Sequence, residues 1–361
     1  MTSPRPRRKA ATPPPPPLPI GTHVGDYEVR NILGSGTFGI VYRVVDALGE
    51  HELAVKEYLP GDLARRDGPV TVVPIGPEQV ESFEMGMRFF VNEGELMRKF
   101  EHPALLRIYG AWKQNGTAYM AMDLVTGRSL VDTMRSRWKS PRESELRALL
   151  DDLLGALEGM HKAGVQHRDI NPRSVLIDPK GRPLLMDLDS PRRVMTARGA
   201  TGPVGPRDGF AGIELYGTGH EHARGPWTDL YALGALLHYM IVGKPPKPAP
   251  QRQAGERLAP GLLRPDLRHS LDFLAVVDWM LAPQPKDRPQ SVAEVREALR
   301  GDGLPQAWRP TRRERWAVRL RRRRPLLVGA VVLVVLGVVG LGVNYLRHHP
   351  ELLARILPAP E

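Results

Sequence analysis

The sequence predicts an α+β protein with two lobes, the first rich in β-strands and the second rich in α-helices, followed by a single C-terminal transmembrane helix. Residues 27–56 are expected to form three short strands, because apolar and polar residues alternate on either side of a glycine turn. From residue 143 onward, apolar residues recur at helical spacing. Residues 326–346 contain no charged side chain. A chain of 361 residues is long enough for one large two-lobed domain.

The N-terminal residues 1–24 differ in composition from the rest of the chain. They are rich in Pro and Arg and low in apolar bulk, so we expect a disordered or polyproline-II segment. It would act either as a plain tether or as a docking segment for a proline-binding partner. No apolar run near the start indicates a cleaved signal peptide. The absence of cysteine excludes disulfides and thiolate metal sites.

The apolar stretch 326–346 has the length of a membrane span. Its 21 residues would form a helix of roughly 31 Å, close to the thickness of a bilayer core. Eight arginines precede it within 312–324 and two follow it, so the positive-inside rule places the N-terminal part in the cytoplasm and the tail 347–361 outside. We expect a single-pass protein of the inner (cytoplasmic) membrane, whose basic juxtamembrane segment 303–325 contacts anionic membrane lipids through 312–324. No nucleic-acid partner is expected, and glycines in the span would let two helices pair, which leaves a homodimer open.

A glycine-rich turn joins the first two predicted strands. The segment "GSGTFGIV" contains Gly34, Gly36 and Gly39, with Val41 after them. Glycines let backbone N–H groups approach phosphate oxygens without an intervening Cβ. The G-x-G-x-x-G pattern also occurs in dinucleotide-binding turns, but a helix follows the turn there, whereas a second strand follows it here. The turn therefore predicts a nucleotide-phosphate site.

The third predicted strand carries a lysine suited to the same ligand. The segment "LAVK" places Lys56 two residues after Ala54, and its ammonium group would hold α- and β-phosphate oxygens. Residues 83–100 have helical spacing and offer a glutamate to orient the lysine. Glu93 is the first candidate for this glutamate and Glu95 the second.

Over residues 27–300 the chain resembles the protein kinase superfamily. Seven landmarks occur in the family's order: "GSGTFGIV", "LAVK", "HRD", "LLMDLD", "GFAGIELY", "WTDLYALGALLHYM" and "PKDRPQS". "GTHVGDYEV", "AVKEYLPGDLARR" and a long interval between Lys56 and Glu93 (93 − 56 = 37 residues) further resemble one group of bacterial membrane-anchored eukaryotic-like Ser/Thr kinases. The resemblance implies a kinase domain over 25–302. Its implied parts are an N-lobe over 25–122, a hinge over 123–127 and a C-lobe over 128–302.

The resemblance also implies a role for each matching residue, with ATP and Mg²⁺ (or Mn²⁺) as cofactors. Asp169 would accept or orient the proton of the substrate hydroxyl, and Asp187 would bind the metal ion. The adenine pocket and hinge would comprise Val41, Ala54, Met122, Asp123, Val125 and Leu176. The residues that organise the catalytic loop and the activation segment would be His167, Arg168, Glu214, Asp229 and Arg288. Thr196 and Thr201 are candidate phosphorylation sites, because Arg168 would pair with a phosphorylated residue of that segment.

Three catalytic positions depart from the family pattern. Asn171 stands where most Ser/Thr kinases carry a lysine that neutralises the γ-phosphate; losing one such donor typically costs about 10²–10³ in rate. Ser174 replaces the Asn that holds a second metal ion. Asp189 replaces a glycine, after Leu188 in place of a phenylalanine. Ser174 and Asp189 are therefore doubtful metal ligands, whereas Asp187 matches the pattern.

Two functions follow from these observations. The first is a membrane-anchored Ser/Thr protein kinase that transfers the ATP γ-phosphate to Ser/Thr hydroxyls of protein substrates in signalling. The second is a pseudokinase, a nucleotide-binding or scaffolding module, which the residues Asn171, Ser174 and Asp189 favour. A small-molecule phosphotransferase of related fold is disfavoured by "GFAGIELY" and by the segment around Asp229.

Overall fold

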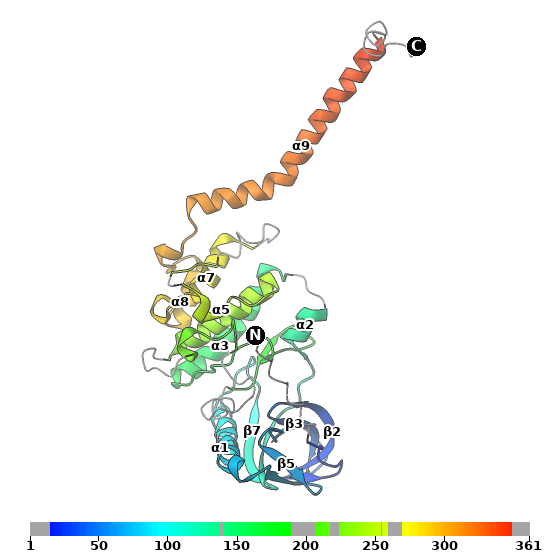
Figure 1. Ribbon diagram of the computed structural model, residues 1–361, viewed down its shortest axis with the longest axis vertical. Helices are drawn as coiled ribbons and strands as arrows, with labels where there is room; N and C mark the ends of the chain where they lie inside the picture. Colours follow the sequence, from blue (N-terminus) through cyan, green and yellow to red (C-terminus); the bar gives the residue numbers. More distant parts are fainter. Residues whose placement is uncertain are drawn as a thin grey trace, which may run out of the picture.

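The computed structural model has a β-rich lobe, an α-helical lobe and a long C-terminal helix that leaves the second lobe (Figure 1). The structure describes residues 15–136, 140–188, 207–216, 224–253, 255–258 and 269–348, with the side chains of 317–332 excepted. One cluster of buried apolar side chains draws on both lobes. The predicted two-lobed α+β architecture is confirmed.

A six-stranded antiparallel sheet forms the N-lobe, in the order β1-β2-β3-β4-β8-β7. Its strands are β1 (His23–Val24), β2 (Tyr27–Gly36), β3 (Gly39–Asp46), β4 (Glu52–Tyr58), β7 (Ile108–Gln114) and β8 (Thr117–Asp123). Because side chains alternate across a strand, Ala54 and Lys56 share one face of β4 and Glu57 lies on the other. The register sets Val41 opposite Lys56 and Ala54 opposite Met122, so these residues lie on neighbouring strands.

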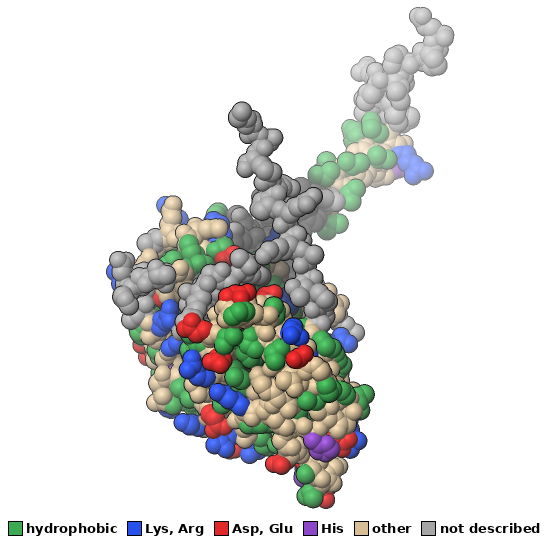
Figure 2. Space-filling model, turned by 60° about the horizontal axis from the view of Figure 1, so that its bottom comes forward, with side chains coloured by type: hydrophobic (Ala, Val, Ile, Leu, Met, Phe, Trp, Pro, Cys, Tyr) green, Lys and Arg blue, Asp and Glu red, His purple; other side chains and the backbone are tan. Residues whose placement is uncertain are grey.

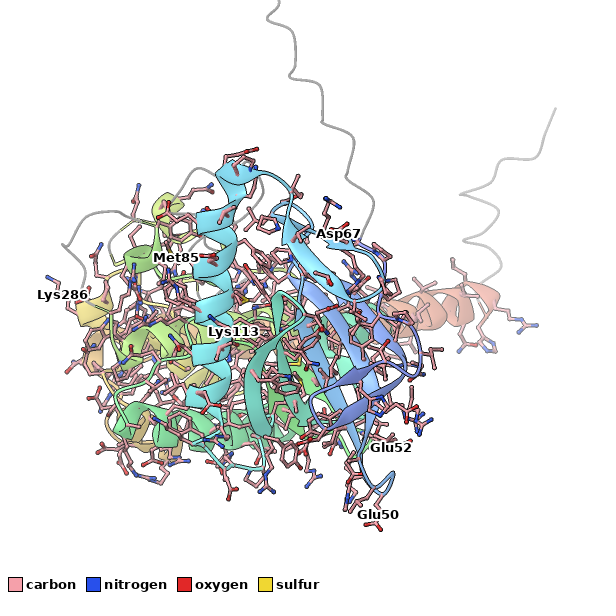
Figure 3. The ribbon with its side chains drawn as sticks, turned by 90° about the horizontal axis from the view of Figure 1, so that it is seen from below. Glu50, Glu52, Asp67, Met85, Lys113 and Lys286 are labelled. Atoms are coloured by element: carbon pink, nitrogen blue, oxygen red, sulfur yellow. The ribbon has the colours of Figure 1, made fainter. Side chains whose placement is uncertain are left out.

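Helix α1 (Val80–Met97) packs against β7 and β8. It lies beside β7 in Figure 1, and Figure 3 shows it from below with Met85 labelled on it. The close approach depends on Gly94, where a Cβ would lie 2.5 Å from the Cβ of Ala111 on β7. The buried stripe of the helix is apolar except for Glu93, which therefore reaches the interior beneath the sheet.

The long interval between β4 and α1 contains a small hairpin. Its strands are β5 (Ala64–Asp67) and β6 (Thr71–Pro74), and the 3₁₀ turn η1 (Pro77–Gln79) follows them. Arg66 of β5 is buried, and its Nη2 donates to Glu57 Oε2 at 2.6 Å. This ion pair ties the hairpin to the face of β4 opposite Lys56, so the inserted residues brace the strand that carries the lysine.

The N-terminal segment packs on the same side of the N-lobe. Arg66 Nε donates to the carbonyl oxygen of Pro16 at 2.7 Å. Leu18 is buried, and its N–H donates to the Tyr42 hydroxyl at 3.0 Å. The segment expected to be disordered or polyproline-II over 1–24 packs against the N-lobe from residue 15 onward, because these buried polar groups use it as a hydrogen-bond partner. The first 14 residues lie outside the described chain.

The C-lobe is built mainly from helices around α5. Its elements are β9 (Arg128–Ser129), α2 (Leu130–Ser136), α3 (Glu143–Lys162), β10 (Val175–Ile177), β11 (Pro183–Leu185), η2 (Ile213–Leu215), α5 (Pro226–Val242), η3 (Ala249–Gln251), α7 (Leu271–Met280), η4 (Pro285–Asp287), α8 (Val292–Arg300) and η5 (Gln306–Trp308). Helix α5 is apolar on all sides and packs against α3 and α7, as expected of a helix inside a core. It begins near Asp229, which brings that carboxylate into the interior.

Helix α9 (Arg312–His348) projects away from the C-lobe (Figure 1). Near its start, Arg315 Nη2 donates to Asp272 Oδ1 of α7 at 2.8 Å. Toward its end, apolar side chains lie uncovered, with Leu333 71% and Leu341 72% exposed (Figure 2). Within the described side chains, no helix combines the length and apolar character needed to cross a bilayer. Part of the predicted span 326–346 falls in 317–332, whose side chains lie outside that description.

Candidate active site

The glycine-rich turn lies at the end of the β2–β3 hairpin. Gly39 has a φ of 157°, and a Cβ there would lie 1.7 Å from the carbonyl oxygen of Glu57, so the hairpin contacts β4 this closely only with glycine. At Gly34 and Gly36 an added Cβ would meet no heavy atom within 4 Å. Packing within the protein therefore does not require glycine at these two positions. The open space that a Cβ would fill suits the phosphate oxygens of a nucleotide.

Lys56 joins the two lobes. Its Nζ donates to Asp187 Oδ1 at 2.6 Å. Burial disfavours the charge on Lys56, but the carboxylates of Asp187 and Glu93 outweigh this effect and raise the pKa of Lys56. Burial also disfavours the charge on Asp187, and Lys56 outweighs it, so the pKa of Asp187 lies below its ordinary value. Both groups therefore carry their charges at neutral pH.

Glu93 reaches this pair from α1. It is 6% exposed, and its Oε1 accepts the backbone N–H of Leu188 at 2.9 Å. The glutamate thus fixes the segment directly after Asp187 while its charge acts on Lys56. The second candidate, Glu95, lies at the surface and pairs with Arg98 at 3.2 Å, so the geometry favours Glu93.

Asp229 organises the loop that carries Asp169. Its Oδ2 accepts the His167 N–H at 2.8 Å and its Oδ1 accepts the Arg168 N–H at 2.7 Å. Arg168 has a φ of 64°, a left-handed conformation that is costly outside glycine. The carboxylate, which is 0% exposed, stabilises this strained turn and so determines where Asp169 emerges.

The ring of His167 braces the same loop from within. Its Nδ1 accepts the Asp169 N–H at 3.3 Å, and its Nε2 lies 3.2 Å from the carbonyl oxygen of Met186. Burial lowers the pKa of His167, so the ring is neutral at pH 7. In that state Nε2–H donates to Met186, and one ring ties the catalytic loop to the residue before Asp187.

The two catalytic-loop residues that depart from the family pattern, Asn171 and Ser174, both form hydrogen bonds to Asp169. Asn171 is 1% exposed, and its Nδ2 donates to the Asp169 carbonyl oxygen at 2.7 Å and to Asp169 Oδ1 at 3.0 Å. Ser174 is 3% exposed, and its hydroxyl donates to the Asp169 carbonyl oxygen at 2.7 Å and accepts the Asn171 N–H at 3.0 Å. The Ser174 hydroxyl is thus committed to the loop rather than directed at a metal ion.

Arg207 completes the site and was missed at the sequence level. Its Nε donates to Asp169 Oδ1 at 2.8 Å, and its Nη2 donates to Asp169 Oδ2 at 3.2 Å. This is a two-point contact between a guanidinium and a carboxylate. The available signal was the position of Arg207, three residues before "FAGIELY", where the activation segment returns to the catalytic loop.

The predicted adenine pocket lies between β3, β4 and β8 above and β10 below. Ala54 and Met122 are buried, and Val41 packs against the same core. Asp123 in the predicted hinge accepts the Tyr109 hydroxyl at 2.7 Å through Oδ1, and its backbone N–H donates to the Arg107 carbonyl oxygen at 3.1 Å. Leu176 is half-buried on β10.

The end of the activation segment is fixed to the C-lobe by a buried ion pair. Arg288 Nη1 donates to Glu214 Oε1 at 2.8 Å, and both side chains are 0% exposed. The Arg288 guanidinium also lies 4.4 Å from the ring centre of Tyr231 on α5. The remaining predicted residues of this segment, Asp189, Thr196 and Thr201, lie outside the described residues.

Among the described side chains, Asp187 is suited to bind a divalent metal ion and Ser174 is not. The Asp187 carboxylate is the hard oxygen ligand that Mg²⁺ and Mn²⁺ prefer, and 43% of its side chain is exposed although its surroundings in the protein partly desolvate it. The Ser174 hydroxyl does not act as a second ligand, because it bonds to the Asp169 carbonyl oxygen and the Asn171 N–H. Among the described residues, no group of three or more His, Cys, Asp or Glu side chains is placed to hold a metal by itself. Such a site relies on nucleotide phosphates for its other ligands, as is usual for Mg²⁺.

The class of protein follows from comparison with known families. A family model described as the protein kinase domain matches residues 27–299. The chain belongs to the protein kinase family. Its similarity extends to the solved apo form of PpkA-294, with 34% identity and a TM-score of 0.71 over 78% of this chain and 99% of that chain.

Curated bacterial relatives are Ser/Thr kinases. PknB of Mycobacterium leprae is 28% identical over 291 residues, which cover 77% of this chain and 43% of PknB. PknK of Mycobacterium tuberculosis is 29% identical over 278 residues, which cover 74% of this chain and 23% of PknK. The chain therefore spans less than half the length of either relative.

Proposed function

We propose that this chain is a membrane-anchored Ser/Thr protein kinase that transfers the γ-phosphate of ATP to protein hydroxyls. The observation that carries the proposal is the Lys56–Asp187 pair at 2.6 Å, formed across the two lobes. The pair places a phosphate-binding cation next to a metal-binding carboxylate. Asp169 lies on the adjoining loop, which Asp229 organises. The bacterial Ser/Thr kinases that the chain resembles support the same reaction.

Each bond, electron pair and proton in the proposed phosphoryl transfer is accounted for by ATP, the substrate hydroxyl and Asp169. The substrate hydroxyl oxygen forms a bond to the γ-phosphorus as the bond from that phosphorus to the β–γ bridging oxygen breaks, and the electron pair leaves with ADP. The hydroxyl proton passes to a carboxylate oxygen of Asp169. Lys56 holds α- and β-phosphate oxygens during this step. Asp187 would hold Mg²⁺ or Mn²⁺, which would supply positive charge to the phosphates.

Membrane anchoring is supported by the sequence of α9. Residues 326–346 carry no charge, eight arginines precede them, and Leu333 and Leu341 lie exposed on the helix. An alkaline carbonate wash of membranes tests this part of the proposal, because it strips peripheral proteins and leaves spanning ones. The full chain should stay in the membrane pellet. Its release into the wash would contradict a membrane span.

The kinase activity is tested with the full chain purified in detergent. With labelled ATP and Mg²⁺ or Mn²⁺, the chain should phosphorylate itself and an added Ser/Thr-rich protein such as casein. Lys56→Ala should lower transfer by about 10²–10³ or more, because it removes a charge that stabilises the transition state. The matched control is Lys113→Ala, an exposed lysine on β7 (labelled in Figure 3), which should leave transfer unchanged.

A nucleotide-binding pseudokinase is the second candidate, and one observation favours it. The Ser174 hydroxyl bonds to the loop backbone, so position 174 does not supply a second metal ligand. If the wild-type chain is stabilised by ATP in a thermal shift but transfers no phosphate with either metal, this second function replaces the first.

A further inference from the structure

The part of the site around Asp169, where the phosphoryl group would be transferred, is called the transfer end. It lacks two sources of positive charge that the protein kinase pattern contains. Position 171 holds an asparagine in place of a lysine, and position 174 holds a serine in place of a second-metal ligand. Both side chains are buried and bonded to the Asp169 carbonyl oxygen, and the uncharged Asn171 amide also donates to Asp169 Oδ1, so neither brings a positive charge. A γ-phosphate at this end would meet an uncompensated Asp169 unless another cation is present.

Arg207 supplies a cation at this end. Its two contacts with Asp169 place the guanidinium directly at the catalytic carboxylate. Arg207 therefore lies at the carboxylate that would receive the proton of the substrate hydroxyl. Its side chain is 31% exposed, so the guanidinium is not fully covered by the protein.

We propose that Arg207 is the γ-phosphate-binding cation of this kinase and takes over the charge of the lysine that position 171 lacks. The inference rests on the proposed kinase function and names a further catalytic residue for it. In the transfer step, Arg207 stabilises the negative charge on the γ-phosphoryl oxygens while Asp169 receives the hydroxyl proton.

The donors and charges at the site are consistent with this role. A guanidinium has five N–H donors, and two are used on Asp169, which leaves three for phosphate oxygens. Glu93, Asp169 and Asp187 bring three negative charges to the site, against the two positive charges of Lys56 and Arg207. Removal of Arg207 would make the site still more negative toward a polyanionic nucleotide. An arginine supplied within the same chain is a known way to stabilise a phosphoryl-transfer transition state.

The alternative to a catalytic role is that the contact between Arg207 and Asp169 inhibits the kinase. A guanidinium bonded to both carboxylate oxygens of Asp169 would also exclude a substrate hydroxyl. The two roles predict opposite results for a variant that keeps hydrogen bonding and loses charge, so Arg207→Gln separates them. Arg207→Lys restores the charge without the two-point geometry.

The first measurement is nucleotide affinity without metal. The full chain in detergent is titrated with ATP and with ADP in the presence of EDTA. Wild type should prefer ATP, and Arg207→Gln should lose about tenfold in ATP affinity with ADP affinity unchanged, because only ATP carries the γ-phosphate. Arg207→Lys should retain most of the preference. Arg182→Gln, which breaks a surface pair with Asp178, is the control and should change neither affinity.

The second measurement is steady-state transfer with Mg²⁺. Arg207→Gln should lower kcat by about 10²–10³ with little change in KM for the protein substrate, since the contact forms with the transferring group. An unchanged ATP-to-ADP preference, or a rise in kcat for Arg207→Gln, would overturn the inference. The readouts separate the two proposals. An ATP preference that depends on Arg207 in a chain that transfers no phosphate would refute only the kinase function. Normal transfer by Arg207→Gln would refute only the role of Arg207.

Discussion

The two ends of the catalytic cleft are built in different ways. At the glycine-turn end, Lys56, Glu93 and Asp187 stand where the family pattern places them, and each contributes a charge at its own position. At the transfer end, Asn171 and Ser174 hold the backbone of the loop, and the cation comes from Arg207, a distant residue in the chain. Loop geometry and positive charge are therefore provided by separate residues at this end. A substitution in a catalytic motif can remove one without removing the other.

The largest effect on stability is expected from removal of the carboxylate that holds the catalytic loop. Asp229→Ala would leave the buried N–H groups of His167 and Arg168 without their acceptor. We expect the free energy of unfolding to fall by about 3 kcal/mol or more. Urea unfolding of the full chain measures this change. Asp272→Ala, which breaks an exposed pair with Arg315, should change it by about 1 kcal/mol or less. Equal effects of the two substitutions would show that the loop does not depend on Asp229.

As the pH falls, the free energy of unfolding should decrease through protonation of His238 in the C-lobe before Asp187 loses its charge. His238 is buried on α5, and burial lowers its pKa to about 4 from the ordinary 6.5. The unfolded chain takes up this proton near pH 6.5 and the folded chain only near pH 4. Stability is thus complete above pH 6.5 and falls as the pH drops toward 4, by about 2 kcal/mol at pH 5. Asp187, whose pKa is lowered, stays ionised at pH 5.

Urea unfolding at pH 7 and pH 5 tests this expectation. His238→Asn has no charge to gain, so its loss of stability between the two pH values should be about 2 kcal/mol smaller than that of wild type. If both proteins lose the same amount, His238 does not contribute to the acid sensitivity.

A smaller effect is expected at Ser174. Ser174→Ala removes a hydroxyl that bonds to the Asp169 carbonyl oxygen and the Asn171 N–H, so the free energy of unfolding should fall by about 1–2 kcal/mol. The Mg²⁺ concentration for half-maximal transfer should stay the same. A large rise in that concentration would indicate that Ser174 binds metal, contrary to its contacts here.

The sequence predicted the two lobes because these depend on local signals, and the structure brings Lys56, Glu93 and Asp187 together as their motifs suggested. The glycine turn, the strand lysine and the "HRD" segment each have a fixed spacing that one sequence reveals. Asn171 and Ser174 were identified as departures for the same reason. Their bonds to the Asp169 backbone depend on the folded path of the loop, which spacing does not describe.

Arg207 and the N-terminal segment escaped prediction because their partners are far away in the chain. Arg207 meets Asp169 across 38 residues, and Pro16 meets Arg66 across 50. A proline-rich composition indicates weak self-structure but does not exclude packing against a buried arginine on another element. Such contacts follow from the tertiary fold, and no periodicity or fixed motif spacing in the sequence indicates them.

The central claim is that position 207 carries the charge that position 171 lacks, and relocation of that charge tests it most directly. In the 361-residue chain, Arg207→Gln should lower kcat by about 10²–10³, and adding Asn171→Lys to that variant should recover at least about tenfold. Asn171→Lys alone should change kcat little, because Arg207 already supplies the charge. Unfolding midpoints confirm that each variant is folded. If Asn171→Lys gives no recovery in the Arg207→Gln background, or if Arg207→Gln is faster than wild type, the claim is contradicted.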